Sequence, residues 1–318
     1  MNALFEEFDE IAELAEGLDD TSSGTRIMAV MKLANSADPA AIAHLAHAIS
    51  DVDAGVRKQA ALALTAFDGP ETAAALVSAL TDSDPAVIEA AALSLTELKD
   101  PEAGDAILPQ LGDTDTVKLA ACYAVSKELR RPVAMGAAIT ALKNEDAGVR
   151  IEAVGVIGWL QDEGCLPALR DAAKDLDPNV RRTALAALGF SKSEYAEATL
   201  IAALNDPEWL VREAAAETLA KAGGTESVAA LRVAIEDEFW QVRLKAVRSL
   251  GKMNAVEAAL EIAPMMDLLI PNLRKECAAV LGEMAAPETR PYLEKYVDDT
   301  DPDVRKNVRW ALGKIDAQ

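Results

Sequence analysis

The sequence predicts an all-α fold, a right-handed α-α superhelix or solenoid of ten stacked helix pairs. The first observation is a motif that recurs about every 31 residues and is clearest at Asp175-Leu-Asp-Pro-Asn-Val-Arg181. Its last position is occupied in turn by Arg26, Arg57, Ile88, Lys118, Arg150, Arg181, Arg212, Arg243, Arg274 and Arg305. The second is that two segments with helical spacing of apolar residues accompany each copy. Because such repeats share one continuous core, we expect a single domain over residues 1–318.

Each repeat is expected to contain an outer helix, a turn and an inner helix. The first outer helix, residues 3–18, is interpreted as the N-terminal cap because acidic residues lie between its apolar ones. Later outer helices of roughly ten residues lead into turns of the form Asp-x-Asp-Pro, whose acid and proline favour a helix start. The inner helix then begins at a Val-Arg pair. The last repeat, residues 288–318, is interpreted as the C-terminal cap.

Columns of small and aliphatic residues predict how the inner helices pack. The seventh residue after the basic position is aliphatic in every repeat, from Leu33 and Leu64 to Leu312. The third is alanine except at Cys277 and Val308, and the eighth is always Gly, Ala, Ser or Thr. We expect a buried aliphatic ridge, and neighbouring inner helices that approach closely where the side chains are small.

The composition argues against several classes of function. A net charge of −22 repels a phosphate backbone and therefore argues against nucleic-acid binding. No run of about 18 apolar residues occurs, and the acidic first residues do not resemble an export signal. Cys122, Cys165 and Cys277 form no paired pattern, which indicates a reducing compartment. We expect a cytoplasmic protein that does not enter a membrane.

The pattern Asp-x-Asp-x-x-Val-Arg-x-x-Ala-Ala-x-x-Leu-Gly resembles HEAT-like repeats, in the short variety found in phycobilisome bilin lyases. The resemblance covers residues 1–318 and implies a solenoid. It also implies that the aspartate and the arginine six residues later form a structural ladder between repeats. The matching pairs are Asp20/Arg26, Asp51/Arg57, Asp175/Arg181, Asp206/Arg212, Asp237/Arg243 and Asp299/Arg305. The ladder is expected to be weaker at Ile88, Lys118, Arg150 and Arg274, the last because Leu268 replaces its acid.

Enzyme signatures are absent from the sequence. His44 and His47 are the only histidines; they lie three residues apart on an outer helix, where they could ligate a metal. No glutamate follows either of them, however. Neither a Ser/His/Asp or Cys/His arrangement nor a phosphate-binding glycine loop can be assembled. We therefore expect no catalytic residue, no metal site and no cofactor.

The positions that the fold does not need predict a binding surface. Residues one, five and nine after the basic position share one face of the inner helix, which should lie on the concave side. In repeats one to six this stripe is apolar: Ile27, Met31, Leu62, Leu93, Leu119, Tyr123, Ile151, Trp159 and Phe190. In later repeats it mostly holds charge. Such a grouping indicates a partner-binding surface; the alternative is that tight curvature buries these side chains between adjacent inner helices.

Two tryptophans form a second candidate site. Trp209 and Trp240 each lie three residues before the basic position, in consecutive repeats. The two indoles should therefore lie close together on one edge of the solenoid. Exposed tryptophans are effective anchors for a partner protein. The alternative is a local plug over the turn.

The last three inner helices concentrate positive charge. The residues are Lys245, Arg248, Lys252, Lys275, Lys306, Arg309 and Lys314. A basic end on an acidic protein could steer an acidic partner or a carboxylate-bearing ligand. The alternative is that these side chains are only solvated.

Together these features predict a non-catalytic scaffold or adaptor that binds another protein. Its concave stripe would grip a helix or loop of the partner, with Tyr123, Trp159 and Phe190 as the main anchors. The resemblance implies an alternative, a phycobilin lyase subunit or tetrapyrrole-handling chaperone, in which a bilin places its propionates at Arg248 or Lys252. A further alternative is an assembly factor for a metallo-enzyme.

Overall fold

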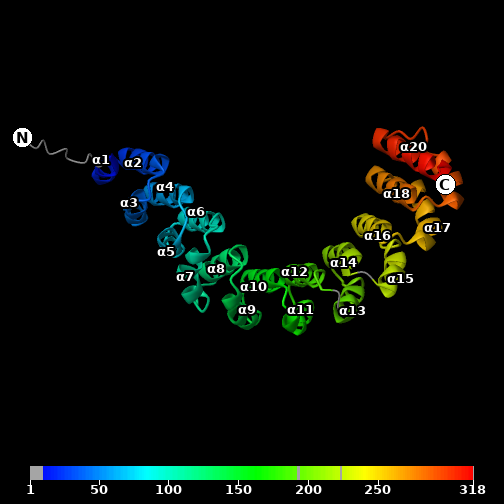
Figure 1. The fold of residues 1–318 in the computed structure, drawn as a ribbon, viewed down its shortest axis with the longest axis horizontal. Coiled ribbons are helices and arrows are strands. Elements are labelled where there is room, and N and C mark those ends of the chain that lie inside the picture. The colour runs from blue at the N-terminus through cyan, green and yellow to red at the C-terminus, as the bar shows by residue number, and fades with distance from the viewer. Residues whose placement is uncertain (1–9, 192–193, 223, 318) are drawn as a thin grey trace, which may run out of the picture. The chain divides into compact units, whose positions relative to one another are not determined.

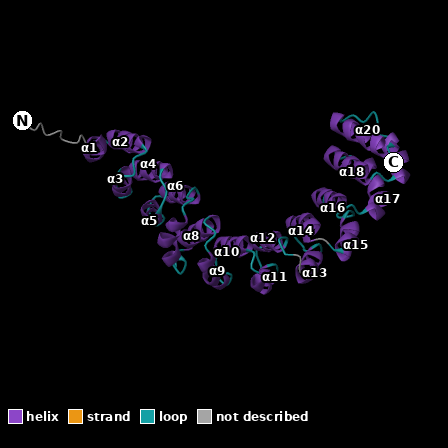
Figure 2. Ribbon diagram, viewed as in Figure 1, coloured by secondary structure: helices purple, strands orange, loops and turns teal. Residues whose placement is uncertain are grey.

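The computed structural model describes residues 10–191, 194–222 and 224–317, with the side chains of Glu163 and Glu194 excepted. All regular structure in these residues is helical (Figures 1 and 2). Two compact units are present, one ending at Leu160 and the other beginning at Gln161. The predicted all-α fold is confirmed, and the described helices are consistent with ten pairs, α1 with α2 through α19 with α20. Residues 3–9 of the predicted cap helix lie outside the described residues.

The first unit has two layers of helices (Figure 1). The inner layer contains α2 (Ser23–Ser36), α4 (Ala54–Ala63), α6 (Pro85–Thr96), α8 (Thr116–Glu128) and α10 (Ala147–Leu160). The outer layer contains α1 (Glu10–Glu16), α3 (Ala41–Ala48), α5 (Pro70–Ala79), α7 (Gly104–Ile107) and α9 (Met135–Ala141). Each inner helix packs against the next one along the chain.

The second unit repeats this arrangement. Its inner layer contains α12 (Pro178–Leu188), α14 (Trp209–Ala222), α16 (Trp240–Lys252), α18 (Pro271–Met284) and α20 (Pro302–Asp316). Its outer layer contains α11 (Leu166–Ala172), α13 (Glu194–Ala203), α15 (Thr225–Ala234), α17 (Ala259–Ile262) and α19 (Arg290–Glu294). No described helix in either unit combines the length and the apolar character needed to cross a bilayer.

Two aspartates with different tasks build the turn before an inner helix. Asp51 Oδ1 accepts a hydrogen bond of 2.8 Å from the backbone N–H of Asp53. Asp53 Oδ1 in turn accepts from the N–H groups of Gly55 and Val56, at 2.8 and 3.2 Å, and so caps α4. The caps of four other inner helices are Asp84, Asp115, Asp177 and Asp301. Since the cap satisfies otherwise unpaired N–H groups, this pattern fixes where each helix begins.

The predicted core columns are buried. The aliphatic seventh position is buried in nine repeats and half-buried only at Leu312. Glycines at the eighth position mark close approaches between inner helices. A Cβ atom on Gly251 would lie 2.7 Å from Val280 Cγ2, and one on Gly282 would lie 2.5 Å from Trp310 Cζ3. Glycine therefore allows these helices to pack more closely than alanine would.

The outer helices are less regular than predicted. The expected length of ten residues holds for α5, α13 and α15, whereas α7 and α17 have only four. Short 3-10 segments follow both, over Leu108–Gln110 and Ala263–Asp267, and contain Pro109 and Pro264. Proline cannot donate the regular helical hydrogen bond and its ring collides with the carbonyl four residues earlier, so these α-helices end early.

Candidate functional site

Five arginines at the starts of inner helices each join two neighbouring turns. Nε and Nη2 donate to the two carboxylate oxygens of an aspartate 25 residues later, at 2.6–3.1 Å. Nη1 donates to the carbonyl six residues earlier, at 2.8–3.0 Å. The pairs are Arg26–Asp51, Arg57–Asp82, Arg181–Asp206, Arg212–Asp237 and Arg274–Asp299. These bonds hold successive repeats in register, as the ladder requires.

The ladder also sets the charge state of its acids. Hydrogen bonds from the guanidinium groups lower the pKa of Asp51, Asp82 and Asp299 below the ordinary aspartate value. The side chains are only about a tenth exposed, so water screens these pairs less than it screens surface ion pairs. The carboxylates are occupied by structural bonds, which leaves them unavailable for catalysis or for ligand binding.

The ladder is broken at one place that was not predicted, and it is intact at Arg274, where a weakness was predicted. Arg274 was expected to be weak because Leu268 lacks an acid, but Arg274 Nη1 uses only the Leu268 carbonyl, at 3.0 Å. That prediction is wrong. The arginine that loses its acceptor is Arg243, because Leu268 stands 25 residues after it. Arg243 Nε is buried and finds no hydrogen-bond partner in the described residues. Ile88 carries no charge and cannot bind Asp113, which stands 25 residues after it. Asp113 is bound instead by Lys118 of its own repeat, at 2.8 Å.

Part of the predicted apolar stripe is exposed in the first unit. Met31 on α2 is 43% exposed and Leu93 on α6 is 59% exposed, while Ile27 and Leu62 are partly exposed. These side chains lie on α2, α4 and α6, which pack side by side. We call Ile27, Met31, Leu62 and Leu93 the apolar patch. Packing between adjacent inner helices does not account for the whole patch, because Met31 and Leu93 remain open to solvent.

Tyr123 and Leu119 do not belong to an accessible stripe. Tyr123 is 1% exposed, and its hydroxyl donates to the Leu111 carbonyl at 3.0 Å. Burial raises the pKa of Tyr123 to about 12, so the phenol stays neutral. Both residues instead line a cavity of about 520 Å³ beside Leu108 and Ala137. The prediction of Tyr123 as an anchor is wrong because the side chain bonds back to the turn before its own helix.

Trp159 lies at the end of α10 and is 45% exposed. The guanidinium of Arg130 lies over its ring, with Cζ 4.5 Å from the centroid. Such a cation–π contact leaves one face of the indole covered. Ile151, at the other end of the same helix, is half-buried. A partner could therefore reach only part of Trp159.

Phe190 belongs to the second unit and follows the end of α12. It is 60% exposed, and Lys221 Nζ lies 5.4 Å from its ring centroid. The two residues occupy the same position of consecutive repeats. Phe190 is thus an exposed ring in contact with a lysine, and we do not count it in the apolar patch, which belongs to the first unit.

Trp209 and Trp240 do not form a paired anchor. Trp209 stacks on Phe239, with ring centroids 5.6 Å apart and planes within 9° of parallel. Arg212 lies over the Phe239 ring, with Cζ 5.4 Å from the centroid. Trp209 and Trp240 are both half-buried. Trp209 is thus packed on the residue that precedes α16, which agrees with the alternative of a local plug, and the role of Phe239 was not predicted from the sequence.

Most of the predicted basic end is neutralised. Lys245 donates to Glu217 at 2.8 Å, and Arg248 binds both carboxylate oxygens of Glu276 at 2.7 and 2.9 Å. Lys275 lies 4.0 Å from Asp303, Arg309 lies 3.7 Å from Asp298, and Lys314 lies over the ring of Trp310. Lys252 and Lys306 are exposed. Four of the seven residues thus have a carboxylate within 4.0 Å, from a neighbouring helix or turn, so only part of the predicted basic end remains without an acidic neighbour in the described residues.

The cysteines are also unsuited to chemistry. All three are buried without a disulfide. Burial raises the pKa of Cys122 to about 12 and also raises the pKa values of Cys165 and Cys277. A buried thiol is a poor nucleophile, because the thiolate is the reactive form. Among the described residues, no group of three or more potential ligands could hold a metal ion.

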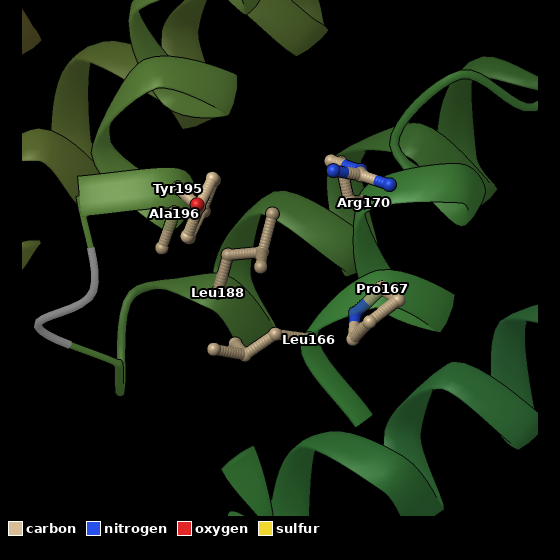
Figure 3. A pocket seen from close by; sticks show the side chains of 6 residues that line it. All are labelled: Leu166, Pro167, Arg170, Leu188, Tyr195 and Ala196. Carbon is tan, nitrogen blue, oxygen red and sulfur yellow. The ribbon is translucent and has the colours of Figure 1, made fainter. Parts of the chain in front are cut away.

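Two exposed features were not predicted from the sequence. Met28 on α2 is exposed beside the apolar patch. In two later repeats the same position carries Lys245 or Glu276, which bind charged residues of the preceding inner helix. An apolar Met28 at the corresponding position of the first repeat therefore indicates an extension of the apolar surface. The second feature is a cavity of about 400 Å³ lined by residues of α11, α12 and α13 (Figure 3). Most of its described lining residues lie on the outer helices α11 and α13, which follow no strict sequence pattern.

Comparison with known proteins places this arrangement in a family. A model of HEAT repeats matches residues 11–85, 51–126, 136–200, 197–268 and 262–318. No curated protein matches the sequence. Among solved structures, an engineered protein is 20% identical, covering 96% of this chain and 98% of that one, with a TM-score of 0.52.

Yeast importin-beta (Kap95p) is 12% identical, with a TM-score of 0.67. The match covers 96% of this chain and 52% of importin-beta, so the chain spans about half of that protein. Kap95p from a structure with RanGDP gives 15% identity and a TM-score of 0.66, over 97% of this chain and 51% of that one. At these identities the likeness concerns the fold. Since the family model matches nearly all of the sequence, the chain belongs to the HEAT-repeat proteins.

Proposed function

We propose that this protein is a non-catalytic scaffold that binds another protein through the inner helices of its first unit. The observation that carries this proposal is the apolar patch, whose members Met31 and Leu93 are 43% and 59% exposed on a strongly acidic protein. Exposed apolar side chains gathered on neighbouring helices are typical of interaction surfaces. The occupant is expected to be a helix or loop with its own apolar face.

The ladder supports this role because it makes the patch rigid. Arg26–Asp51 and Arg57–Asp82 join the turns that precede α2, α4 and α6. A surface that is already ordered loses little conformational freedom when a partner binds. Methionine adds adaptability, since its unbranched side chain fits partners of different shape. The patch thus combines a fixed backbone with adjustable side chains.

The structural neighbours agree with a binding role without defining the partner. Kap95p is described as inducing a change in RanGDP when it binds, so a solenoid of this kind can hold a folded protein. A tetrapyrrole-handling role has less support. Arg248, which that alternative offers for the propionates together with Lys252, already donates from Nε and Nη2 to the carboxylate of Glu276.

The proposal can be tested with two matched double variants. Met31→Asp with Leu93→Asp places charge in the apolar patch. Val52→Asp with Leu176→Asp makes the same kind of change at two almost fully exposed turn residues. Each variant, like the wild type, is used to capture partners from extracts of the source cells, with quantitative mass spectrometry as the readout. Circular dichroism checks that all three proteins are folded.

We expect the patch variant to lose a specific partner that the wild type and the turn variant both retain. Truncating a true anchor costs about 2 kcal/mol or more of binding free energy, or roughly thirtyfold in Kd. A charge on the patch should weaken binding at least as much. If the patch variant retains every protein that the wild type captures, the apolar patch is not the binding surface.

A further inference from the structure

A cavity of about 400 Å³ lies between α11, α12 and α13 of the second unit (Figure 3). Its lining is mostly apolar: Leu166, Pro167, Leu188 and Ala196, together with the ring of Tyr195. Leu188 and Ala196 are buried, whereas Tyr195 is exposed at the rim. The one charged residue among the described lining is Arg170. The volume is within the range of small-molecule sites, which typically measure roughly 300–1,000 Å³.

Arg170 differs from the arginine that occupies the same place two repeats later. Arg232 on α15 binds Glu261 on the next outer helix, with Nε 2.8 Å from Oε2. Glu261 stands 29 residues after Arg232, and the residue 29 positions after Arg170 is Thr199. Thr199 uses its hydroxyl to donate to the Tyr195 carbonyl, at 2.8 Å. Arg232 therefore has a glutamate partner on the next outer helix, whereas the corresponding residue for Arg170 is an uncharged threonine.

The guanidinium of Arg170 is not satisfied elsewhere in the described residues, where it makes no hydrogen bond or ion pair. It also lines a second hollow of about 490 Å³, together with Tyr195, Thr199 and Lys174. Arg181 lines that hollow too, but its guanidinium is held by Asp206 at 2.7 and 2.8 Å. Arg170 thus lies where the apolar cavity meets a polar opening, with its donors available.

We propose that this cavity binds an amphipathic monocarboxylate, with its apolar tail in the cavity and its carboxylate on Arg170. A guanidinium can bind both oxygens of a carboxylate through two parallel hydrogen bonds. The apolar lining favours a hydrocarbon tail because burial removes apolar surface from water. The protein as a whole repels anions, since its net charge is −22. One local guanidinium beside an apolar cavity therefore selects a ligand with a single charge and a substantial tail.

The test measures octanoate binding by isothermal titration calorimetry, with 1-octanol as the uncharged ligand of equal length. Arg170→Gln removes the guanidinium. Thr199→Glu supplies an internal carboxylate at the position that Glu261 occupies beside Arg232, while Arg170 itself is retained. Arg232→Gln is the matched control, because it removes a half-buried outer-helix arginine away from the cavity. Arg170 is exposed and Thr199 is half-buried, so these variants are expected to fold, and circular dichroism checks this.

We expect the wild type to bind octanoate with a Kd on the order of 1 mM or tighter. Arg170→Gln and Thr199→Glu should each weaken binding about tenfold or more, whereas Arg232→Gln should leave it unchanged. 1-Octanol should bind the wild type at least about tenfold more weakly than octanoate. The proposal is overturned by any of three results: no binding of octanoate up to about 10 mM, equal binding of octanol, or equal loss in the Arg232→Gln control.

Discussion

Gly282 occupies a point where the helices α18 and α20 approach closely. An added Cβ would lie 2.5 Å from Trp310 Cζ3 and 2.8 Å from Ala311 Cα. The second contact is to backbone, which cannot rotate away. We therefore expect Gly282→Ala to lower the free energy of unfolding by about 1–3 kcal/mol, the usual cost of overpacking. The urea midpoint of the second unit measures this change.

Gly313 provides the matched control for that substitution. It lies on the same helix as Trp310, and apart from its chain neighbours and the nearby backbone of its own helix, no described atom lies within 4 Å of the position of an added Cβ. Gly313→Ala should leave stability unchanged or raise it by up to about 1 kcal/mol, because alanine favours the helix more than glycine does. Equal midpoints for the two variants would show that helix spacing at Gly282 is not limiting.

Single residues also show where sequence patterns stop being informative. The stripe assigns the same orientation to every residue at a given repeat position, and this holds for Met31 and Leu93. It is wrong for Tyr123, because the step from Ile88 to Lys118 is one residue shorter than the repeat. The hydroxyl of Tyr123 finds the Leu111 carbonyl in the turn that carries this change. A buried hydrogen bond of that kind depends on turn geometry, which the pattern does not contain.

Arg243, in the first turn of α16, lacks the aspartate that binds the corresponding arginines of α12, α14 and α18. Arg243 Nε is buried and unpaired, and Leu268 occupies the place of the aspartate. We expect Leu268→Asp to restore the missing rung, because five other arginines at this repeat position each bind an aspartate 25 residues later. Leu268→Asn is the comparison, since it makes the same change of shape without the charge.

Leu268→Asp should be more stable than Leu268→Asn by about 1.5–3 kcal/mol, the range for hydrogen bonds to charged groups. The difference should vanish when both substitutions are made in an Arg243→Gln background, which forms a double-mutant cycle. Urea denaturation at neutral pH supplies the four values. A difference that persists without Arg243 would mean that the new aspartate acts through another group.

At the level of helices, the inner layer was predictable and the outer layer only in part. Inner helices repeat their caps and core columns, so the starts of α4, α12, α14 and α20 lie two residues before the predicted Val-Arg pairs. Outer helices lack such a strict pattern, and Pro109 and Pro264 shorten two of them. The cavity beside Arg170 escaped prediction for the same reason. The contrast between Arg170 and the corresponding Arg232 depends on the ion pair of Arg232 with Glu261, which only the structure shows.

Over the whole chain, two electrostatic effects oppose each other as the pH falls. At pH 7 the net charge is −22, and protonation of exposed acids relieves repulsion in the folded state. The ladder acids act in the other direction. The pKa values of Asp51, Asp82 and Asp299 are lowered by their arginines, so the folded state favours the charged form. Their stabilisation is fully present above the unfolded pKa of about 3.9 and is lost as the pH falls through the lower, folded pKa.

Asp82→Asn separates these effects, because it removes one ladder charge and changes the total by one unit. We expect the variant to be less stable than the wild type by about 1 kcal/mol or more at pH 7. The gap should shrink as the pH falls below about 4 and then through the lowered pKa of Asp82, since that carboxyl is then progressively protonated. Glu89→Gln on the exposed face of α6 makes the same change in total charge away from the ladder. Its urea midpoint should follow the wild type at both pH values, and a gap for Asp82→Asn that is equally large at pH 2 and pH 7 would show that hydrogen-bond shape, not charge, carries the rung.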